Sequence, residues 1–157
     1  MRKQKGFTLI EMLIVVAIIG ILSSLILVGL SQFRMRGRDA RRIADVKQVQ
    51  NGLEIYYTRN LAYPSVVGVS ASQRWGELTT TITGAGLGLS QISQDPLGDT
   101  HSYDYKDCNS GQNYVIAVQL EDTGNTILQT SVKGTSSGTC DFGGIDCDVA
   151  GMYCVQF

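Results

Sequence analysis

The residues best placed to do chemistry stand at the start of the chain, in MRKQKGFTLIEMLIVV. Glu11 is the only ionisable side chain between Phe7 and Leu30. A charged carboxylate in a bilayer centre costs about 2.5–3.5 kcal/mol on insertion scales, and such residues usually have a partner. No Lys, Arg or His lies within helical reach of Glu11 on its apolar side. The sequence therefore predicts that its cationic partner comes from elsewhere.

Cleavage between Gly6 and Phe7 would create such a partner. The new α-amino group would have a pKa of about 8 and would be largely protonated at neutral pH. In a parallel stack of subunits, the amine of one chain could meet Glu11 of its neighbour and neutralise both charges. Glu11 would then fix the register of the stack, as a buried polar residue fixes register in a coiled coil.

A long helix is predicted to position these residues. The apolar segment 7–30 would span about 36 Å as a helix, enough to cross a bilayer core, so we expect it to be a transmembrane segment that lipid, or copies of the same helix, can cover. The following segment 31–57 keeps helical periodicity and predicts an amphipathic continuation. Its apolar positions are Ala40, Ile43, Val46, Leu53 and Tyr56 or Tyr57, and its predicted solvated face holds Arg41, Arg42, Lys47, Gln48 and Asn51.

The rest of the chain predicts a globular head over residues 31–157, which includes the amphipathic helix. Residues 58–112 are predicted to be a loop region with Trp75 and Leu78 as anchors. Segments 113–121 and 126–132 alternate in hydropathy and predict a hairpin, and the final MYCVQF predicts a third strand. The expected fold class is α+β, with a small antiparallel sheet packed on the amphipathic half of the helix.

Charge and cysteines divide the chain into two halves. Residues 1–59 hold ten Lys or Arg against four Asp or Glu, whereas residues 60–157 hold three against ten. All four cysteines lie in the acidic half, where an even count favours disulfides. Of the three possible pairings, the predicted hairpin favours Cys108 with Cys140 and Cys147 with Cys154.

The stretch KGFTLIEMLIVVAIIGIL resembles the class III signal of type IV pilins and type II secretion pseudopilins. The stretches ARRIADVKQVQNGLEIYY, Tyr63-Pro64 and DPLGDTHSYDY also resemble the major pseudopilin pattern. The resemblance implies that a prepilin peptidase removes leader 1–6 after Gly6 and N-methylates Phe7. It also implies that Glu11 is the assembly residue of a homo-oligomeric helical filament, which inner-membrane machinery builds and in which segment 7–30 is the filament core. The precursor would cross the cytoplasmic membrane once, and the filament would lie at the cell surface or span the periplasm.

Two further features follow from this resemblance. Many relatives have a proline at the position of Val28, where the helix unwinds on assembly, so the departure leaves unwinding of this helix open. The loop CDFGGIDCDVAG resembles the calcium-binding loops of major pseudopilins, which makes Asp141, Asp146 and Asp148 candidate ligands. The spacing of these carboxylates matches no EF-hand, and no other cofactor is expected.

The alternative function is a minor pilin that acts as an adhesion or DNA-uptake binding module. Glu11 favours a core-building subunit instead. The arginine run is interleaved with Asp39 and Asp45 and has no aromatic residues nearby, which favours a solvated helix face, or pairing with neighbouring subunits, over nucleic-acid binding. Catalysis is not expected, because the sequence holds no nucleophile and base set, and His101 stands alone.

Overall fold

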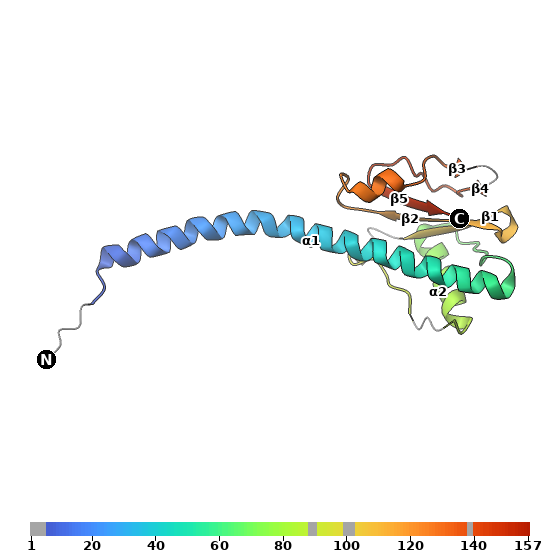
Figure 1. The fold of residues 1–157 in the computed structure, drawn as a ribbon, viewed down its shortest axis with the longest axis horizontal. Helices are drawn as coiled ribbons and strands as arrows, with labels where there is room; N and C mark the ends of the chain where they lie inside the picture. The colour runs from blue at the N-terminus through green and yellow to red at the C-terminus, as the bar shows by residue number, and fades with distance from the viewer. Residues whose placement is uncertain (1–5, 88–90, 99–102, 138–139) are drawn as a thin grey trace. The chain divides into compact units, whose positions relative to one another are not determined.

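The computed structural model describes residues 6–87, 91–98, 103–137 and 140–157, without the side chains of residues 25–29. His101 therefore lies outside the described residues. The chain divides into two compact units, Met1–Gly37 and Arg38–Phe157. Figure 1 shows the order of the elements along the chain. We call the second unit the head.

Helix α1, Leu9–Asn60, confirms the predicted long helix. Its part in the first unit exposes large apolar side chains such as Ile10, Leu13 and Ile14. Within the described residues, no helix is both long enough and apolar enough to cross a membrane. The side chains of residues 25–29, which belong to the predicted spanning segment 7–30, are not among those described.

The prediction of a loop region over 58–112 is wrong in two places. Residues Ala71–Gly84 form helix α2, and Asp104–Cys108 form strand β1. The hydroxyl of Ser70 accepts from the Gln73 backbone N–H, and the Gln73 side chain accepts from the Ser70 N–H, so a capping box starts α2. The predicted anchors Trp75 and Leu78 are confirmed as buried residues of this helix.

The main sheet is antiparallel and has the order β1-β2-β5, with β2 at Asn113–Gln119 and β5 at Met152–Gln156. Strands β1 and β2 form a hairpin that aligns Tyr105 with Ile116, and β5 aligns Val155 with Ile116 on the other side. The strand predicted at 126–132 is wrong, because Thr126–Thr130 form the 3-10 helix η3. A second small sheet pairs β3, Ser136–Ser137, with β4, Cys140–Asp141.

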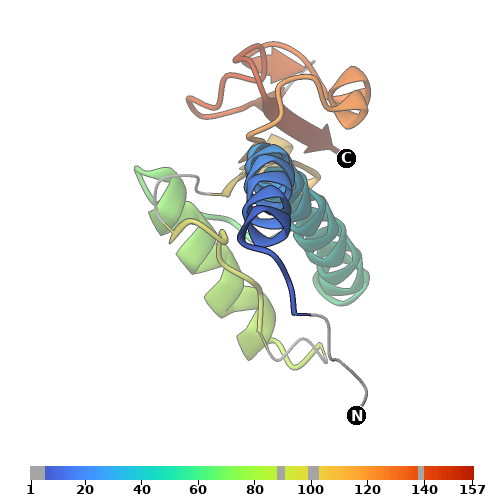
Figure 2. The ribbon, with the colours of Figure 1, turned by 90° about the vertical axis from the view of Figure 1, so that its left-hand side faces the viewer.

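The main sheet separates two clusters of buried side chains. One face carries Ile116 and Val118, which pack with Val46, Val49 and Leu53 of α1 and with α2. The other face carries Val115, Ala117 and Cys154, which pack under the C-terminal loops with Phe142 and Ile145. The alternation along β2 is the period of two expected for a strand buried on both faces. Figures 1 and 2 show the head as three layers: helices, sheet and C-terminal loops.

Two disulfides hold the C-terminal loops against the sheet. Cys108 at the end of β1 bonds Cys140, and Cys147 bonds Cys154 on β5. This is the pairing favoured by the sequence, but the hairpin used to derive it is not the one present. The loops reach the sheet closely at Gly151, which has φ +81°, and a Cβ there would lie 2.8 Å from the Leu120 carbonyl oxygen. Glycine at this position is therefore a steric requirement.

Candidate processing and assembly site

Glu11 has a neutral intramolecular partner, Thr8. Its Oε2 accepts hydrogen bonds from the Thr8 backbone N–H and the Thr8 hydroxyl, both at 2.7 Å, while the Glu11 N–H lies 3.3 Å from Thr8 Oγ1. Because α1 begins at Leu9, Thr8 is the N-cap and Glu11 is the third residue of the first turn. The arrangement is a capping box, which satisfies N–H groups that would otherwise lack partners at the helix start.

Sequence reasoning missed this role of Thr8, although the signal was present. Thr8-Leu9-Ile10-Glu11 has the S/T-x-x-E spacing directly before an apolar run, which is the sequence pattern of a capping box. A neutral partner at the helix terminus was overlooked because only cations were sought. Both bonds from Thr8 reach Oε2, so Oε1 of Glu11 accepts no hydrogen bond within the described residues.

The two residues at the predicted cleavage site are exposed. The side chain of Phe7 is 86% exposed and directly precedes the capping residue. A Cβ added to Gly6 would meet no described atom within 4 Å, and the backbone of Gly6 is not in the left-handed region. Within the described residues, nothing therefore requires glycine at position 6.

The three carboxylates proposed to bind calcium do not form a ligand group. Asp141 accepts from the Gly143 N–H, and Asp146 accepts from the Asp148 N–H, so each of these two stabilises its own turn. No group of three or more His, Cys, Asp or Glu side chains among the described residues could hold a metal ion. Calcium binding by Asp141, Asp146 and Asp148 therefore stays a prediction.

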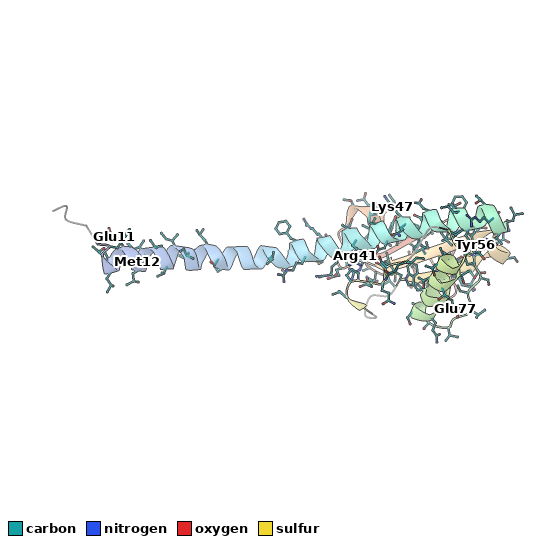
Figure 3. All side chains as sticks on the ribbon, turned by 90° about the horizontal axis from the view of Figure 1, so that it is seen from below. Glu11, Met12, Arg41, Lys47, Tyr56 and Glu77 are labelled. Carbon is teal, nitrogen blue, oxygen red and sulfur yellow. A yellow bond between two sulfur atoms is a disulfide. The ribbon has the colours of Figure 1, made fainter. Side chains whose placement is uncertain are left out.

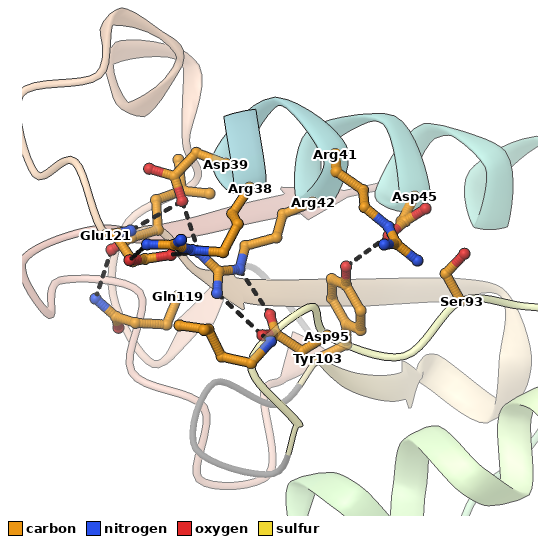
Figure 4. A network of polar contacts seen from close by, with 12 residues as sticks. Arg38, Asp39, Arg41, Arg42, Asp45, Ser93, Asp95, Tyr103, Gln119 and Glu121 are labelled. Carbon is orange, nitrogen blue, oxygen red and sulfur yellow. Dashed lines mark hydrogen bonds and ion pairs between the residues drawn. The ribbon is translucent and has the colours of Figure 1, made fainter. Parts of the chain in front are cut away.

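A buried charge cluster in the head is the second feature that the sequence did not reveal. We call it the Arg42 cluster, and it consists of Arg38, Asp39, Arg42, Asp95 and Glu121 (Figure 4). Arg42 donates from Nε and Nη2 to Asp95, at 2.6 and 2.9 Å, and from Nη1 to Asp39 and Glu121, both at 2.7 Å. Its side chain is fully buried, so the prediction that Arg42 lies on the solvated face is wrong.

The electrostatics of the cluster favour its charged form. Burial alone would lower the pKa of Arg42, but hydrogen bonds to Asp95, Glu121 and Asp39 together raise it above its ordinary value. Hydrogen bonds from Arg38 and then Arg42 lower the pKa of Glu121 to about 2. Asp39 also accepts from the backbone N–H groups of Glu121 and Asp122. The cluster therefore joins α1 to the loop at Asp95 and to the segment after β2.

Comparison with known proteins identifies the N-terminal segment first. Residues 1–27 match the model of the prokaryotic N-terminal methylation motif. Type II secretion system core protein G of Vibrio cholerae is 30% identical over 110 residues, which cover 66% of this chain and 72% of that protein. Core protein G of Escherichia coli is 35% identical over 63 residues, or 40% of this chain and 43% of that protein. Core protein G of Pseudomonas aeruginosa is 38% identical over 64 residues, which cover 41% of this chain and 45% of that protein.

These findings define a prokaryotic protein with an N-terminal methylation motif and a pilin-like α+β head. The chain belongs to the family of type II secretion system core protein G. It is a structural protein and not an enzyme, as the sequence predicted. The alignments with the Escherichia coli and Pseudomonas aeruginosa relatives span less than half of those proteins. No solved structure matches the chain significantly.

Proposed function

We propose that this chain is a structural subunit of a type II secretion filament and is assembled through its N-terminal helix. A prepilin peptidase cuts the precursor between Gly6 and Phe7 and methylates the new amine of Phe7. The family relationship to core protein G, which extends over 110 residues, is the observation that carries this proposal. The match of residues 1–27 to the methylation motif supports the processing step.

The accessibility of the N-terminal segment supports recognition by a peptidase. Gly6 and Phe7 are both exposed, and the described chain gives no internal reason for glycine at position 6. A peptidase that needs close approach to the backbone would supply that reason, because glycine has no Cβ. The leader is then removed by an external partner without disturbing the capping box that begins at Thr8.

The geometry of Glu11 supports its role in assembly. Thr8 uses only Oε2, so Oε1 can accept a hydrogen bond from the methylated amine of a neighbouring subunit. A charge-assisted bond of this kind is about twice as strong as a neutral one. Glu11 therefore keeps its own helix capped while it pairs with the neighbour, and cleavage creates the cation that completes the pair.

The apolar helix gives the subunit two successive environments. Before assembly, residues 7–30 hold the precursor in the cytoplasmic membrane, where the assembly machinery collects it. After assembly, the same residues form the core of a homo-oligomeric helical filament that crosses the periplasm. Support comes from the sequence between Phe7 and Leu30, in which Glu11 is the only ionisable side chain, and from the exposure of its large apolar residues.

Replacing Glu11 separates processing from assembly. In cells that express the secretion machinery, Glu11→Ala should leave cleavage after Gly6 and methylation of Phe7 intact, as read by mass spectrometry of the N-terminus. The yield of sheared filaments should fall below detection, because the amine of the neighbour loses its acceptor. Glu11→Gln, which keeps the shape and removes the charge, should behave in the same way. Normal filament yield from both variants would contradict the proposal.

A further inference from the structure

The outer side of α1 in the head is a basic surface. Its exposed residues include Ala40, Arg41, Ala44, Lys47, Asn51 and Ile55, which we call the basic helix face. Arg41 and Lys47 lie near its two margins (Figure 3). Helical spacing places the small side chains of Ala40 and Ala44 between them. No exposed carboxylate accompanies them on the described residues 38–60, because the acidic side chains there are buried or half-buried.

The C-terminal loops of the head form an acidic surface. Asp141, Asp146 and Asp148 are exposed, and the chain contains no Lys or Arg after Lys133. The turn bonds accepted by Asp141 and Asp146 hold the backbone in place. Val149 is 46% exposed beside them. We call residues 141–149 the acidic loop.

The sheet separates these two surfaces. The basic helix face belongs to a helix that packs on the side of the sheet carrying Ile116 and Val118. The acidic loop covers the side carrying Val115 and Ala117. Because residues of opposite parity lie on opposite faces of a strand, the sheet lies between the two surfaces within one head. The acidic loop of a chain therefore cannot reach the basic helix face of the same chain.

We propose that the acidic loop of one subunit docks on the basic helix face of a second copy of the chain. Asp146 and Asp148 approach Arg41 and Lys47, and Val149 packs among the small and apolar side chains between those cations. The contact joins different surfaces of identical subunits, and heterologous contacts of this kind build helical filaments when their rotation does not close into a ring. This inference rests on the proposed function and adds to it a contact between heads.

A charge-reversal experiment on the full chain tests the docking. Lys47→Glu and Asp148→Lys should each lower the yield of sheared filaments by about fivefold or more, since an attraction at every contact becomes a repulsion. The double variant, which restores opposite charges, should recover most of the yield. Lys47 makes no polar side-chain contact within the described part of the head, and Asp148 uses its backbone N–H rather than its side chain in the turn. Both can therefore be replaced without breaking a described contact.

Two controls separate docking from general effects of charge. Lys47→Arg keeps the positive charge and should assemble normally. Thr80→Glu adds a carboxylate to the exposed side of α2 and should also assemble normally. Normal yield from both single reversals, or no recovery in the double variant, would overturn the inference while leaving the proposed function intact. Failure of the unaltered chain to form filaments would instead reject the proposed function.

Discussion

The environment of Arg42 in the head is not predicted by its local sequence. Arg42 stands in a run of arginines, yet its side chain is fully buried and bonded to three carboxylates. Two of these, Asp95 and Glu121, are more than fifty residues away in sequence. A buried ion pair contributes little net stability over an apolar replacement of both partners, but removal of one partner is strongly unfavourable. Loss of Arg42 would therefore leave buried carboxylates without a compensating positive charge.

Replacing Arg42 with methionine tests this account. Arg42→Met leaves the carboxylates of Asp39 and Asp95 buried without their cation, so the free energy of unfolding should fall by about 3–5 kcal/mol. Arg41→Met is the matched control, because the Arg41 side chain is 58% exposed and its Asp45 contact is long at 3.9 Å. That control should change stability by less than about 1 kcal/mol. Chemical unfolding of the two full-length variants, followed by near-ultraviolet circular dichroism, gives the comparison, and equal losses would refute it.

Helices and strands differ in how far the sequence predicts them. The long periodic pattern predicted α1, and the alternation in NYVIAVQ and MYCVQ predicted β2 and β5. Helix α2 was not predicted, because its segment is rich in threonine and was interpreted as a loop. Two signals were nevertheless present: Ser70 and Gln73 have capping-box spacing, and Trp75, Leu78 and Ile82 recur at helical steps. Segment 126–130 alternates like a strand but forms a 3-10 helix, where Asn125 caps it by accepting from the Ile127 N–H.

The N-terminal site and the Arg42 cluster also differ in how far the sequence predicts them. Gly6, Phe7, Thr8 and Glu11 lie within six residues, so local pattern contains all the information needed to group them. The Arg42 cluster combines residues of α1, a loop and the segment after β2, and the local sequence around Arg42 does not indicate Asp95 or Glu121. Tertiary packing decides which of its charged side chains are buried. The periodicity of apolar residues cannot predict this, because it assigns polar positions to the exposed face.

The C-terminal end of α1 gives a prediction about a single element. Leu61 follows the helix with φ +56° and a side chain that is 72% exposed. Its N–H donates to the Tyr57 carbonyl at 2.8 Å, so it terminates the helix in the left-handed conformation that favours glycine. Leu61→Gly should raise the free energy of unfolding by about 0.5–1 kcal/mol, because relief of the strain exceeds the added chain entropy.

Leu61→Ala is the control for this prediction. Alanine shortens the exposed side chain but keeps the Cβ, so it should give no such gain in stability. Thermal unfolding of the three proteins under one set of conditions is the measurement. A lower midpoint for Leu61→Gly than for the unaltered chain would show that the leucine side chain contributes more than its exposure indicates.

The head as a whole is held together by links between its layers. The two disulfides tie the C-terminal loops to the sheet, and the Arg42 cluster ties α1 to the loop at Asp95 and to the segment after β2. The disulfides are covalent, whereas the Arg42 cluster depends on ionised carboxylates. Acid should therefore loosen the helix layer while the disulfides keep the C-terminal loops attached.

The pH dependence of stability follows from Glu121. Hydrogen bonds from Arg38 and then Arg42 lower its pKa from 4.5 to about 2 in the folded head. Since the folded pKa lies below the unfolded one, the unfolded chain binds more protons between these values, and stability falls as pH falls. The contribution of Glu121 should be complete above pH 4.5, decline through the interval below it, and be lost as pH falls through about 2.

Glu121→Gln isolates this contribution from that of the other carboxylates. The variant should be less stable than the unaltered chain at pH 7, because Arg38 and Arg42 lose a charged acceptor. The difference between the two proteins should shrink as the pH falls from about 4.5 to about 2, since protonation removes the same charge from the unaltered chain. Unfolding midpoints measured across this range give both curves. A difference that stays constant with pH would mean that Glu121 stabilises the head by packing and neutral hydrogen bonds rather than by its charge.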